Sequence, residues 1–150
     1  MSWHSILPYD RIQAWYRKFR AELFSAPRPT GKYIVVNLDV ENVRSMLGAR
    51  YYAPNWEFSY YKRGEVLNLA RVEWYYDDGF PEHQWWQVHV RGWRQDGQLW
   101  LKAHWELEPT EAGREHILGE GFSAGAGRAA LEKTLKDADV DYEVKSYEER

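Results

Sequence analysis

Hydrophobic and polar positions follow a helical period near the start of the chain. Residues 8–25 place their apolar side chains on one helical face, and Pro-Arg-Pro follows at 27–29, so this segment predicts an amphipathic N-terminal helix. Residues 32–38 are rich in β-branched side chains and predict a buried strand. A short helix is expected next, with Asp39 as its N-cap and Gly48 at its end.

Between residues 55 and 108 the period changes to two. Turn signals at Arg63-Gly64, at Asp77–Pro81 and at Asp96-Gly97 divide this segment into four strands. The pattern therefore predicts a four-stranded antiparallel β-meander. The three strand-to-strand connections are short enough for neighbouring strands to pair in sequence order.

The remainder of the chain predicts two helices and one more strand. We expect a short helix over 110–118, a glycine-rich connection or lid over 119–127, and a C-terminal helix over about 128–138. Alternating apolar residues at 140–144 predict a last strand, and the acidic tail at 145–150 is expected to be flexible. The fold class is α+β: one domain over 1–150, in which the meander and its flanking strands pack with the N-terminal and C-terminal helices.

Composition narrows the class of protein. Of the 150 residues, 44% are hydrophobic and 29% charged, which is typical of a globular chain rather than a membrane-spanning or disordered one. The absence of cysteine excludes disulfides, thiolate metal sites and cysteine nucleophiles. No secretory signal is recognisable, so we expect a cytoplasmic protein that does not contact a membrane.

The register of the last hairpin follows from its turn. Asp-Gly favours a type I′ turn, which makes Gln95 pair with Gln98 and sets every other pair of the ladder. Trp86, Val88 and Val90 then share a core face with the apolar residues of the next strand. The opposite face carries the pairs Trp85–Glu108, Gln87–Glu106, His89–His104, Arg91–Lys102 and Trp93–Trp100.

This second face is the candidate functional surface. Arg71 and Glu73 share a parity on the preceding strand, and we expect them to extend the surface beside the histidines. The leading hypothesis is a small binding domain for an anionic or aromatic ligand, such as a nucleotide or an RNA segment. Tryptophans would stack on bases, basic residues would hold negative charge, and His89 and Gln87 would orient the ligand. The residues expected to bind are Arg71, Glu73, Trp85, Gln87, Arg91, Trp93, Trp100 and Lys102.

Two alternatives use the same face. One is a metal-independent phosphodiesterase or ribonuclease, in which His89 and His104 act as base and acid beside Glu106. The other is a homodimeric structural or interaction protein with this face as its interface. The same three residues could also ligate a metal ion, but their spacing matches no diagnostic metal motif. No metal or other cofactor is therefore predicted.

Overall fold

The computed structural model describes residue 19 and residues 26–55, 62–109 and 112–148. Contacts divide the chain into two compact units, residues 1–29 with 56–65, and residues 30–55 with 66–150. In the first unit Glu65 N donates a hydrogen bond to Lys62 O at 3.1 Å, and Gly64 has a φ of 76°, so the predicted turn at Arg63-Gly64 is confirmed. Except for Phe19, the predicted helix over 8–25 lies outside the described residues. Residues 56–61 of the first predicted strand also lie outside them.

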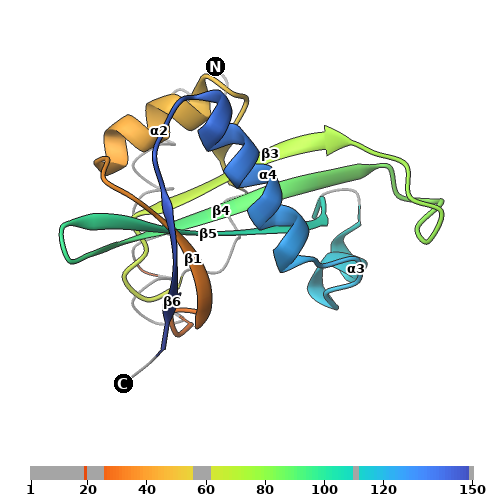
Figure 1. The fold of residues 1–150 in the computed structure, drawn as a ribbon. Coiled ribbons are helices and arrows are strands. Elements are labelled where there is room, and N and C mark those ends of the chain that lie inside the picture. Colours follow the sequence, from red (N-terminus) through yellow and green to blue (C-terminus); the bar gives the residue numbers. More distant parts are fainter. Residues whose placement is uncertain (1–18, 20–25, 56–61, 110–111, 149–150) are drawn as a thin grey trace, which may run out of the picture. The chain divides into compact units, whose positions relative to one another are not determined.

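The second unit is built on a six-stranded antiparallel sheet (Figure 1). Its spatial order is β2-β3-β4-β5-β1-β6. β3, β4 and β5 are three strands of the predicted four-stranded meander, β2 pairs with β3, and β1 pairs with the other side of β5. The α+β class is therefore confirmed. The strands are β1 Gly31–Val36, β2 Ala53–Pro54, β3 Leu67–Trp74, β4 Trp85–Gln95, β5 Gln98–Leu107 and β6 Glu143–Tyr147.

Three helices accompany the sheet, α2 Val40–Gly48, α3 Gly113–Ile117 and α4 Ala124–Asp137. The side chain of Asp39 accepts a hydrogen bond from Asn42 N at 2.7 Å, which confirms the predicted cap of α2. Helix α4 begins earlier than predicted because Ser123 Oγ accepts from Ala126 N at 3.1 Å and caps it there. Part of the predicted glycine-rich connection is thus helical.

Helix α4 lies across one face of β4 and β5 (Figure 1). The side chains between them belong to the main core. Val88 and Val90 of β4 meet Leu131 and Leu135 of α4, and all four side chains are fully buried. Gly127 allows this close approach, because a Cβ at that position would overlap the backbone of His104. The core face predicted for the hairpin is confirmed.

The C-terminal strand differs from its prediction. β6 begins at Glu143 and pairs with β1 up to Tyr147, so three residues of the tail expected to be flexible belong to the sheet. Val140 and Tyr142 precede the strand and pack against the main core, which explains their apolar character. In the described part of the chain, no helix has the length and hydrophobicity needed to cross a bilayer.

Candidate functional site

The hairpin of β4 and β5 has the predicted register. Asp96 and Gly97 have φ values of 52° and 74°, as a type I′ turn requires, and Gln95 pairs with Gln98. The same ladder pairs Gln87 with Glu106, His89 with His104, Arg91 with Lys102 and Trp93 with Trp100. Sequence reasoning therefore placed these residues on one face correctly.

Burial of that face is the feature that sequence reasoning missed. Gln87 and His89 are 2% and 3% exposed, and Glu106 is 8% exposed. Polar groups inside a protein are costly unless they find partners. The predicted polar surface is therefore an interior layer at this end of the sheet, and its partners determine what it can do.

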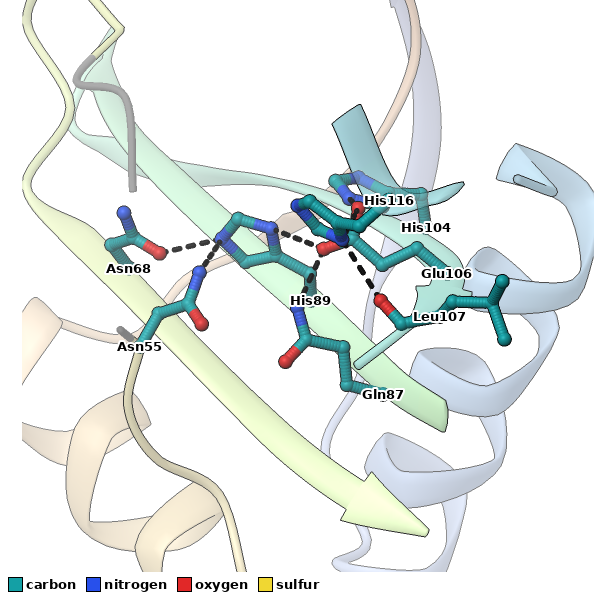
Figure 2. A network of polar contacts seen from close by, with 8 residues as sticks. All are labelled: Asn55, Asn68, Gln87, His89, His104, Glu106, Leu107 and His116. Carbon is teal, nitrogen blue, oxygen red and sulfur yellow. Dashed lines mark hydrogen bonds and ion pairs between the residues drawn. The ribbon is translucent and has the colours of Figure 1, made fainter. Parts of the chain in front are cut away.

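Glu106 is the centre of a polar network (Figure 2). Its Oε1 accepts a hydrogen bond from Gln87 Nε2 at 2.6 Å and lies 3.2 Å from His89 Nδ1. Its Oε2 lies 2.9 Å from His104 Nε2. Adjacent strands thus direct two imidazoles and one amide at a single carboxylate.

The far side of His89 faces two amides. His89 Nε2 lies 2.6 Å from Asn68 Oδ1 and 2.9 Å from Asn55 Nδ2. A ring nitrogen donates to an amide oxygen or accepts from an amide nitrogen, but it cannot do both. The contact with Asn68 is the shorter one, which favours the tautomer protonated at Nε2. Figure 2 shows the ring between this pair of amides and Glu106.

A third histidine comes from α3. His116 Nδ1 donates to the backbone oxygen of Leu107 at 2.8 Å and lies 3.6 Å from Glu106 Oε2. Since Nδ1 carries the proton, Nε2 of the neutral ring is left to accept a bond. His116, Asn55 and Asn68 were not among the predicted site residues. Asn68 meets the site through the pairing of β3 with β4, whose register no local turn fixes, and the other two meet it through tertiary contacts.

The charge state of the site follows from its burial. Desolvation lowers the pKa of His89 to about 3, against the smaller opposite effect of Glu106. Burial alone would raise the pKa of Glu106, but its contacts with His104 and His89 together outweigh this effect and hold that pKa well below its usual range. At neutral pH the network therefore contains an ionised carboxylate beside a neutral His89.

The three central residues have the geometry of a metal site. One ligand atom each from His89, His104 and Glu106 lies within 4.8 Å of the other two. Two atoms that bind one ion at about 2.1 Å with tetrahedral angles are about 3.4 Å apart, close to the 3.2 and 2.9 Å found around Glu106. The two contacts use different oxygens of the Glu106 carboxylate, so a shared ion would require the three side chains to move.

The other end of the same face is an aromatic cluster. Trp93 and Trp100 are 2% and 6% exposed and pack around Tyr33 of β1, whose ring centroid lies 5.7 and 5.9 Å from theirs. Arg91 is also buried, and Lys102 Nζ donates to Lys32 O at 3.3 Å. Trp85 is half-exposed at the edge of the face. Stacking on Trp93 or Trp100 would require a ligand to enter the protein interior.

Arg71 and Glu73 lie on the opposite face from the histidines, contrary to expectation. β3 pairs Arg71 with Val88 and Glu73 with Trp86, both of which belong to the core face. Arg71 forms an ion pair with Glu73 at 2.5 Å and sits 5.0 Å from the ring of Tyr52. The loop between β3 and β4 does not impose a register as a two-residue turn does, so the parity of β3 could not be read from its sequence.

Comparisons with known proteins give no further guide. No protein family profile, curated protein or solved structure matches the chain. The function is therefore argued from the buried His and Glu network and from its surroundings.

Proposed function

We propose that the protein binds one divalent transition metal ion through His89 Nδ1, His104 Nε2 and the carboxylate of Glu106. Two imidazoles and one carboxylate form a ligand set that suits zinc or iron(II). Three protein ligands leave at least one coordination position for water or a substrate. A centre of this kind supports hydrolytic or oxidative chemistry.

The contact that carries this proposal is between His89 Nε2 and Asn68 Oδ1, 2.6 Å apart. An amide oxygen only accepts, so in the tautomer that this shorter contact favours the ring proton is on Nε2 and Nδ1 carries a lone pair. That lone pair faces Glu106 Oε1 at 3.2 Å, so two acceptors converge on the same space. A cation between them satisfies both.

The surrounding residues resemble the outer layer of known metal sites. Metal-bound histidines generally donate their second N–H to an oxygen, and bound carboxylates accept further hydrogen bonds. Asn68 serves His89 in this way, and Gln87 donates to Glu106 Oε1 at 2.6 Å. His116 makes the same type of bond to Leu107 O, and its Nδ1 lies 3.6 Å from Glu106 Oε2.

Titration with cobalt(II) tests the proposal, because the visible absorption of this ion reports its coordination. The wild-type chain is expected to give a saturable spectrum at one equivalent, and Glu106→Gln is expected to weaken binding more than about 100-fold. His83→Asn is the matched control, since His83 lies 3.6 Å from Glu115 and outside the network. Absence of a wild-type spectrum, or equal binding by Glu106→Gln, would contradict the proposal.

A metal-free acid–base pair is the second candidate. It is favoured by the 2.9 Å contact of His104 Nε2 with Glu106, since a carboxylate in this position orients a catalytic imidazole. His104 is also the more exposed of the two sheet histidines, with 18% of its side chain accessible against 4% for His89. The metal-free candidate predicts that the protein hydrolyses a phosphodiester when a chelator is present, and that His104→Ala loses this activity.

Binding of a nucleotide or RNA segment and formation of a homodimer stay predictions. Burial of Trp93 and Trp100 leaves the nucleotide hypothesis without its two central stacking rings. The network of His89, His104 and Glu106 at the polar end of the face has the ligand geometry described above, so the function is proposed for that network.

A further inference from the structure

A pocket lies on the other face of the same strands and shares no residue with the polar network. Its volume is about 440 Å³, within the range of small-molecule sites. Four aromatic rings line it, together with one carboxylate and small residues of the 121–130 segment. The rings belong to Tyr75, Phe80, Trp86 and Trp105.

The aromatic rings of the pocket stand in two orientations, parallel and perpendicular. Trp86 and Trp105 stack with an interplanar angle of 10° and centroids 5.5 Å apart. Tyr75 is nearly perpendicular to both indoles, at 85° and 89°, and Phe80 is perpendicular to Trp86 at 84°. Aromatic rings in two orientations therefore form the walls of the pocket.

The charge on the described lining of the pocket is negative. Asp77 is the acidic residue among the lining side chains described, and none of these is a lysine, arginine or histidine. Asp77 Oδ1 accepts from Gly79 N at 2.8 Å, which fixes the carboxylate and leaves Oδ2 for a ligand. A fixed negative charge beside aromatic rings favours a cation with apolar substituents.

Small residues keep the space open. Gly121 has a φ of 75°, and a Cβ there would lie 2.8 Å from the ring of Trp86, so the chain passes close to the indole. Ala126 and Ala130 are one turn apart on α4 and both line the pocket. Larger side chains at these helix positions would fill it.

We propose that this pocket binds a small quaternary or methylated ammonium compound. The aromatic faces attract the diffuse positive charge, and Asp77 supplies the opposite charge at the pocket wall. A strongly hydrated ammonium without methyl groups fits such a lining less well, because its hydration would be lost. The pocket volume suits a free small molecule.

Isothermal titration of the intact chain with choline and tetramethylammonium tests the proposal. Saturable binding is expected, with at least tenfold weaker binding of the neutral isostere that has carbon in place of the ammonium nitrogen. Asp77→Asn is expected to weaken choline binding about tenfold, and Ala126→Phe to abolish it in a protein that still folds by circular dichroism.

Asp78→Asn is the matched control, because Asp78 is exposed in the same turn and does not line the pocket. It is expected to keep wild-type affinity for choline. The proposal is overturned if neither cation binds, if the neutral isostere binds as well as choline, or if Asp77→Asn and Ala126→Phe both bind choline like the wild type.

Discussion

Two cross-strand pairs on one face of the β4–β5 hairpin lie in different environments. Trp93 and Trp100 pack around Tyr33, and the cluster continues to Tyr147 of β6 with ring centroids 5.8 Å apart. The pair of His89 and His104 has ring centroids 4.8 Å apart, but it surrounds an ionised carboxylate. Both pairs are mostly buried, so exposure does not distinguish them.

The difference lies in what each end gains from burial. The aromatic end buries large apolar surfaces and rings in edge-to-face contact, which stabilises the fold directly. The histidine end buries a charge and several polar atoms, and replacing such groups by apolar residues is often neutral or stabilising. A stability argument therefore accounts for the tryptophans, whereas the histidines and Glu106 call for a functional one.

Removal of an indole from the aromatic end is expected to have the largest effect. Trp93→Ala should lower the free energy of unfolding by about 3–5 kcal/mol, because it leaves a cavity between β4 and β1. Urea denaturation followed by circular dichroism measures this. The folded fraction should still bind metal with wild-type affinity, and a loss of metal binding in that fraction would break the separation between the two ends.

Metal addition should stabilise the histidine end. At an ion concentration about 100 times the dissociation constant, the free energy of unfolding should rise by about 2.7 kcal/mol, because the native state binds the ion and the unfolded chain binds it weakly. Thermal unfolding with zinc, and again after chelator, measures the shift. Glu106→Gln is the control, and an equal shift in that variant would show that the ion binds elsewhere.

Asn68→Ala should affect metal binding without removing a ligand. Loss of the oxygen that accepts from His89 Nε2 is expected to weaken metal affinity about 10–100-fold, equivalent to about 1.4–2.7 kcal/mol. Competition with a chromophoric chelator gives the affinity. Gln98→Ala, at the exposed turn end of β5, should leave it unchanged, and equal affinities in all three proteins would contradict the proposed role of Asn68.

Acidification should destabilise the metal-free protein through the histidine end. In the native state the pKa of His89 is about 3, whereas in the unfolded state the ring becomes protonated below its ordinary pKa of 6.5. The unfolded state thus binds the extra proton first, so stability is retained above pH 6.5 and falls as pH decreases, by up to about 1.4 kcal/mol per pH unit. Urea titrations between neutral pH and pH 5 should show a shallower slope in His89→Gln, and an unchanged slope would contradict this assignment.

The sequence predicted most of the sheet and the composition of the site. The Asp96-Gly97 turn determines the pairing of β4 with β5, and this pairing alone brings His89, His104 and Glu106 together. The N-cap at Asp39 and the burial of Val88 and Val90 could likewise be predicted, because helix capping and the alternation of apolar and polar residues are local properties of the sequence.

Tertiary contacts account for the features that local patterns missed. Burial of Trp93 and Trp100 depends on β1, a strand distant in sequence whose pairing with β5 has no signature in its own residues. His116 reaches Glu106 because α3 follows β5 directly and folds back over it. The side of β3 that carries Arg71 depends on a loop without a defining turn type, so its parity was open.

Native mass spectrometry of the intact chain after incubation with one equivalent of zinc tests the central claim most directly. The account predicts a mass increase of one zinc ion per chain in the wild type, lost under denaturing conditions and lost in Glu106→Gln. Wild-type spectra without retained metal, or equal retention by Glu106→Gln, would contradict it.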